Sequence, residues 1–67
     1  MDPYDTGYKA GILSCNMEPG LILAFRMRRA KEAATMFAHL GGVDREQFID
    51  GFLAGYSQRQ TEKDQGE

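Results

Sequence analysis

Two nine-residue segments near opposite ends of the chain share one pattern of glycines and aromatic residues. Residues 4–12 and 48–56 both read aromatic, two spacers, Gly, aromatic, spacer, Ala, Gly, large apolar residue. If both segments are helical, the two glycines of each lie four residues apart on one face, beside the aromatic side chains. Another helix backbone can then come close to that face. The pattern therefore predicts helix packing at Gly11 and Gly55, with a ligand held in the two glycine grooves as the alternative.

The shortness of the chain limits how it can be stabilised. Sixty-seven residues form one domain, and a domain of this size needs support beyond a small core. Cys15 is the only cysteine, so no disulfide can form within the chain. Cys15 and His39 are also the only soft or imidazole ligands, whereas a structural zinc site takes four ligands. Tight helix packing and oligomerisation remain, and we expect both.

Helix start and stop signals divide the chain into three helical segments and a polar tail. The first helix is expected over residues 3–14, with Asp2 as its N-cap, and a break follows at residues 16–20. The second, over residues 21–40, is rich in strong helix formers and ends at a pair of glycines. The third begins at Asp44, where Gln47 completes a capping box, and runs to about Tyr56. Beyond it we expect fraying, because no apolar side chain remains to be buried.

These segments predict an all-α fold, with one small three-helix domain over residues 1–56 and a polar C-terminal tail over residues 57–67. We expect the long central helix and the third helix to form a hairpin, with the short first helix packed across them. Apolar residues on the central helix recur at alternating steps of four and three, which is a heptad-type seam. Its excess apolar surface predicts a homodimer or a larger homo-oligomer. The seam consists of Leu23, Met27, Ala30, Ala34 and Phe37.

The second segment also concentrates four positive charges within six residues, at Arg26, Arg28, Arg29 and Lys31. Guanidinium groups bind phosphates and carboxylates through paired hydrogen bonds, so this cluster is the first candidate surface for an anionic partner. The alternative is a solvated helix face, on which Arg28 pairs with Glu32 one turn later.

Tyr8 and Tyr56 are further candidates for binding, because a tyrosine ring can stack on a base or fill a pocket of a partner. The pentapeptide Gly-aromatic-x-Ala-Gly, found at residues 7–11 and 51–55, resembles one in ribosome modulation factor. The likeness covers five residues, and the chain lacks the basic character of that family. We therefore assign no family from it.

Several classes of protein are disfavoured by the residue content. Ten acidic and eight basic side chains give a net charge of −2, which argues against a protein that coats nucleic acid. The sequence shows no phosphate loop, catalytic triad or set of metal ligands, so we expect neither enzyme activity nor a cofactor. It also opens without a basic and apolar leader and contains no run of about 20 apolar residues. We therefore expect a cytoplasmic protein without membrane contact.

A binding role remains. We expect a regulator or inhibitor of the phage or bacterial accessory type, which acts by occupying a surface on a larger protein. One alternative is an oligomer that sequesters a phosphate-bearing ligand, such as a nucleotide signal, through its arginines and tyrosines. A further alternative is contact with RNA or the ribosome through the same basic residues.

Overall fold

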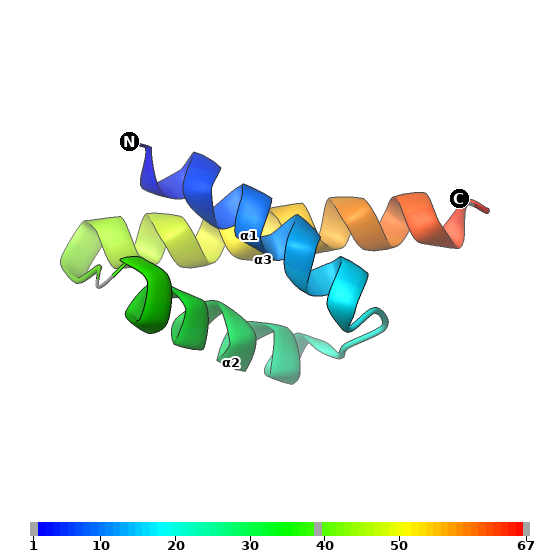
Figure 1. Cartoon of the computed structure of the whole chain (residues 1–67), viewed down its shortest axis with the longest axis horizontal. Coiled ribbons are helices and arrows are strands. Elements are labelled where there is room, and N and C mark those ends of the chain that lie inside the picture. The colour runs from blue at the N-terminus through cyan, green and yellow to red at the C-terminus, as the bar shows by residue number, and fades with distance from the viewer. Residues whose placement is uncertain (1, 39, 67) are drawn as a thin grey trace.

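The computed structural model describes residues 2–38 and 40–66, apart from the side chains of residues 37 and 38. These residues form helix α1 (Pro3–Met17), helix α2 (Leu23–Ala33), a π-helical turn η1 (Ala34–Ala38) and helix α3 (Gly42–Asp64) (Figure 1). The described part of the chain contains no strand, so the fold is all-α, as predicted. None of its helices has the length and apolar character that crossing a membrane requires.

The start of α1 follows the sequence signals. The Asp2 side chain accepts a hydrogen bond from the Tyr4 amide at 3.0 Å, and Pro3 occupies the first helical turn. The helix ends just before Pro19 and Gly20, and Gly20 adopts a φ of 78° that favours glycine.

The start of α3 differs from the prediction. Gly41 is the N-cap and makes no side-chain capping bond, while Asp44 lies inside the first turn. The capping box expected from Asp44 and Gln47 is therefore wrong, because the helix already begins two residues before Asp44. Asp44 still suits this place, since a carboxylate in the first turn complements the helix dipole.

The close backbone approach that the glycines predict lies between α1 and α3. A Cβ atom added at Gly7 or Gly11 would collide with the backbone carbonyl of Phe48 or Phe52. One added at Gly51 would collide with the Tyr4 carbonyl, and one at Gly55 would meet the backbone of Tyr8 in the same way. Since the contacting positions advance together along both helices, α1 and α3 run in the same direction, as Figure 1 shows.

The predicted arrangement of helices needs correction on this point. The main partner of α3 is α1, rather than the second helix, and α3 is the longest element with 23 residues. The regular part of α2 has only 11 residues, because the backbone changes to the π-helical turn at Ala34. The glycines of α1 and α3 let the two helix backbones come close along their contact.

The core gathers around α3. Phe48, Phe52 and Tyr56 are almost completely buried, together with Cys15 of α1. From the predicted seam, Ala30 and Ala34 are buried and Met27 is half-buried, whereas Leu23 is exposed. The side chain of Phe37, the fifth seam residue, lies outside the described structure.

Residues 57–64, expected to fray, continue α3 as helix. Their polar side chains bind the end of α1 and the turn that follows it. Arg59 donates to the Asn16 side chain at 2.8 Å, and the Gln60 side-chain oxygen accepts from the Gly20 amide at 2.6 Å. Sequence composition alone missed this, because these contacts satisfy polar groups and need no apolar side chain.

Candidate functional site

A groove with a volume of about 420 Å³ lies between α1, α2 with η1, and α3. Its polar lining includes Thr6, Ser14 and three charged residues, and apolar side chains form its walls and floor. We call it the α1–α2 groove. The apolar residues that matter most for its chemistry are Leu13, Met17, Ala33, Met36, Phe48 and Phe52.

The walls and the floor of this groove differ in exposure. Phe48 and Phe52 form a floor that is already buried against α1. Leu13, Met17 and Met36 stand on the walls with 63%, 82% and 67% of their surface exposed. Large apolar side chains gathered in a concave surface are typical of a binding site, and flexible methionines adapt to different partners.

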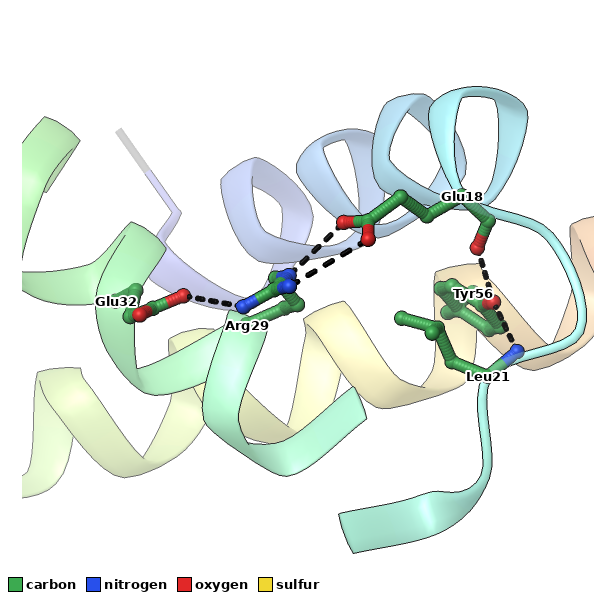
Figure 2. Close-up of polar contacts among 5 residues, drawn as sticks. All are labelled: Glu18, Leu21, Arg29, Glu32 and Tyr56. Carbon is green, nitrogen blue, oxygen red and sulfur yellow. Dashed lines mark hydrogen bonds and ion pairs between the residues drawn. The ribbon is translucent and has the colours of Figure 1, made fainter. Parts of the chain in front are cut away.

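An ion-pair network crosses the rim of the α1–α2 groove (Figure 2). Arg29 of α2 donates from Nε to one carboxylate oxygen of Glu18 at 2.9 Å, and from its terminal nitrogens to the other at 3.4 Å and to Glu32 at 3.0 Å. The hydrogen bonds from Arg29 hold the pKa of Glu18 below its ordinary value. The hydrogen bonds that Arg29 donates to Glu18 and Glu32 raise the pKa of Arg29. Two carboxylates share one guanidinium here, so the network carries one surplus negative charge.

A second set of contacts fixes the turn between α1 and α2. The Tyr56 hydroxyl donates to the Glu18 carbonyl at 2.5 Å and accepts from the Leu21 amide at 2.9 Å (Figure 2). Arg26 donates from Nε to the Leu21 carbonyl at 2.6 Å, and its guanidinium lies 4.5 Å from the centre of the Tyr56 ring. Because this turn sets how α2 leaves α1, these contacts hold the two walls of the groove in place.

The four basic residues of the candidate cluster have different surroundings in the structure. Arg26 and Arg29 are used inside the chain, for the turn and for the groove rim. Arg28 and Lys31 are exposed, and Arg28 stands 5.9 Å from the ring centre of Phe25. The expected ion pair between Arg28 and Glu32 is not found. Glu32 forms an ion pair with Arg29 instead, three residues before it.

The two tyrosine candidates also occupy different places. Tyr56 is fully buried, with its hydroxyl engaged in the turn, so it does not present a ring to a ligand. Tyr8 is half-buried and packs beside Tyr4, with 6.4 Å between the ring centres. Its backbone lies against Gly55, which gives this part of α1 a packing role.

Sequence reasoning missed the exposed walls of the groove. A signal was present, because Ala10, Leu13 and Met17 recur at steps of three and four on α1. They form a second apolar stripe, beside the one that carries Tyr4, Tyr8 and Cys15. Met36 also follows Ala33 at a step of three, and the structure places it in the π-helical turn, on a wall of the groove.

Within residues 2–38 and 40–66, no cluster of three or more His, Cys, Asp and Glu side chains is arranged to hold a metal ion. His39 lies outside the described residues. The chain matches no family model, no curated protein and no solved structure.

Proposed function

We propose that this chain is a small non-enzymatic binding protein of the cytoplasm, a regulator or inhibitor that acts by protein–protein interaction and also associates with itself. The observation that carries the proposal is the α1–α2 groove, with Leu13, Met17 and Met36 exposed on its walls. A helix or loop of another protein that covers these side chains removes their apolar surface from water.

The size of this effect suits a binding hot spot. Complete burial of one large aliphatic side chain contributes roughly 1.5–3 kcal/mol to the free energy of binding. Partial burial of the three wall side chains therefore contributes roughly 3–6 kcal/mol. A micromolar complex needs about 8 kcal/mol. The remainder must come from polar contacts at the rim, where Glu18, Arg29 and Glu32 are within reach of a partner.

The two alternatives rely on residues that have other tasks in the folded chain. A phosphate-bearing ligand at Arg29 competes with the carboxylates of Glu18 and Glu32, and one at Arg26 competes with the Leu21 carbonyl and the Ser57 hydroxyl. Arg28 and Lys31 remain exposed on α2, and two cations offer a weak site for RNA. The contacts of the arginines therefore support a protein partner over either alternative.

Site-specific photo-crosslinking tests the proposal. A benzophenone amino acid replaces Leu13, which lines the groove, or Val43, which does not and is equally exposed at 65%. On irradiation in cells that make the protein, we expect protein adducts from position 13 at several times the yield from position 43. The adduct mass distinguishes a second copy of the chain from a larger protein.

Equal adduct yields at the two positions would contradict the proposal. Calorimetric titration with nucleotides and with RNA tests the two alternative functions. We expect no binding heat from either ligand, and saturable binding that is lost in Arg28→Glu would favour the alternatives.

A further inference from the structure

The exposed face of α2 continues directly into a wall of the groove. Phe25, Arg29 and Glu32 follow one another at steps of four and three residues, which places them on one side of α2. Ile22 is the N-cap at the start of this face, and Met36 follows Glu32 in the π-helical turn. Arg29, Glu32 and Met36 line the groove, whereas Ile22 and Phe25 are exposed at the other end of this face. One face of α2 thus has exposed apolar side chains at one end. At its other end it forms a wall of an apolar groove that can bury such side chains.

Charge selects one way in which two such faces can pair. In an antiparallel pair, the register that sets Phe25 opposite Met36 also sets Arg29 opposite Glu32, because both steps along the helix are four residues. A register that sets Ile22 opposite Met36 brings Arg29 against Arg29, since both lie seven residues away. Like charges that face each other are unfavourable, so the first register is favoured over the second.

The same register also neutralises the surplus negative charge at the rim of the groove. Glu18 and Glu32 share the single guanidinium of Arg29, which leaves one surplus negative charge. Arg28 is exposed, and none of the described residues forms an ion pair with it. When Phe25 of one copy lies opposite Met36 of the other, Arg28 comes within one turn of Glu32 of the other copy.

We propose that two copies of the chain pair through this face of α2, antiparallel about a twofold axis, with the Phe25 ring of each copy in the α1–α2 groove of the other. The proposal rests on the proposed function, because it names the occupant of the same groove. Twofold symmetry repeats each contact and closes the assembly as a dimer. A larger partner that uses this groove competes with the second copy.

A mixing experiment with two variants tests this arrangement. Phe25→Asp removes the inserted ring and keeps the groove, whereas Met17→Asp damages the groove and keeps the ring. Both positions are exposed, Phe25 at 45% and Met17 at 82%, so both variants should fold, which circular dichroism checks. Val43→Asp is the matched control on an exposed apolar residue outside the face. Sedimentation velocity from micromolar to millimolar concentration measures association.

We expect each variant alone to dimerise at least about tenfold more weakly than wild type, because an unpaired carboxylate enters an apolar contact. Mixing the two should restore association in part, because the mixed dimer keeps one intact contact between Phe25 and a groove, whereas a dimer of either variant alone has lost both. A folded Phe25→Asp variant that dimerises like wild type would overturn the inference, as would a mixture that associates no better than its components. A wild-type chain that stays monomeric at millimolar concentration would overturn it as well. Failure of this dimer model does not affect the photo-crosslinking test. Cross-linking of a larger protein at position 13 would still support the proposed binding role of the groove.

Discussion

Adding one methyl group at Gly11 should force α1 and α3 apart. A Cβ atom there would lie 2.9 Å from the Tyr56 amide nitrogen and closer still to the Phe52 carbonyl oxygen, whereas ordinary contacts begin at 3.4 Å. Both neighbours are backbone atoms of a helix, so neither can rotate away. The helices must separate, and separation loosens the buried rings of Phe52 and Tyr56 together with Cys15.

The magnitude follows from two opposing effects of Gly11→Ala. Alanine is favoured over glycine in a helix by about 1 kcal/mol. Overpacking of a close contact costs about 1–3 kcal/mol, and more when backbone has to move. We take the upper end, since the obstructing atoms are backbone, and expect a net loss of about 2 kcal/mol. A chain of this length has a total stability of roughly 3–10 kcal/mol, so the loss is a large fraction of it.

Thermal unfolding followed by circular dichroism measures this change. A loss of about 2 kcal/mol lowers the Tm of a domain this small by roughly 8–16 °C. The control is Gly41→Ala, because a Cβ atom at Gly41 meets nothing within 4 Å. There the gain from a stiffer unfolded chain and the poorer N-cap nearly cancel, and the Tm should change little. A higher Tm for Gly11→Ala than for wild type would refute the close approach of α1 and α3.

Three further predictions concern the contacts around the turn and the groove rim. Tyr56→Phe removes two hydrogen bonds to the turn between α1 and α2 and should cost about 2 kcal/mol in urea unfolding; an unchanged midpoint would contradict this. Arg26→Ala should lower the Tm by several degrees while Arg28→Ala leaves it nearly unchanged, because only Arg26 holds the turn; equal shifts would contradict this. The pKa of Glu18 is lowered by its hydrogen bonds with Arg29, so this pair stabilises the fold fully above the pKa of the unfolded carboxyl and loses that effect as the pH falls through the lowered pKa. Glu18→Gln should therefore be less stable than wild type at pH 7 and no less stable in strong acid, whereas a difference that persists in acid would show another cause.

The glycine pattern predicted a contact without naming its partner. Gly11 and Gly55 indicate that a backbone comes close to each helix, and the structure shows that they face one another's helices. Nothing local distinguishes this from a hairpin of the second and third helices, because the choice depends on the whole packing. The extension of α3 to Asp64 is of the same kind, since Gln60 contacts Gly20 and Cys15, which lie 40 and 45 positions away in the sequence.

The basic cluster shows why the site was harder to predict than the fold. Arg26, Arg28 and Arg29 look alike in the sequence, and their placement on the helix surface was predictable. In the structure Arg26 donates to the Leu21 carbonyl of the turn and Arg29 forms an ion pair with Glu18, while Arg28 is exposed. The three arginines differ because the connection at residues 18–22 returns the chain beside Arg26 and Arg29, and the residues of this connection do not themselves predict its path. Tyr56 was misplaced for the same reason, because its hydroxyl partners belong to that turn.

We propose the α1–α2 groove as the surface through which this chain binds other protein chains. Methionine methyl groups report on it directly, because Met17 and Met36 line the groove and Met27 lies half-buried elsewhere on α2. A series of NMR spectra of methyl-labelled protein at rising concentration follows all three as the chain associates. We expect the Met17 and Met36 signals to shift together, with the dissociation constant found by sedimentation, while the Met27 signal keeps its position. Association that leaves Met17 and Met36 unshifted would contradict it.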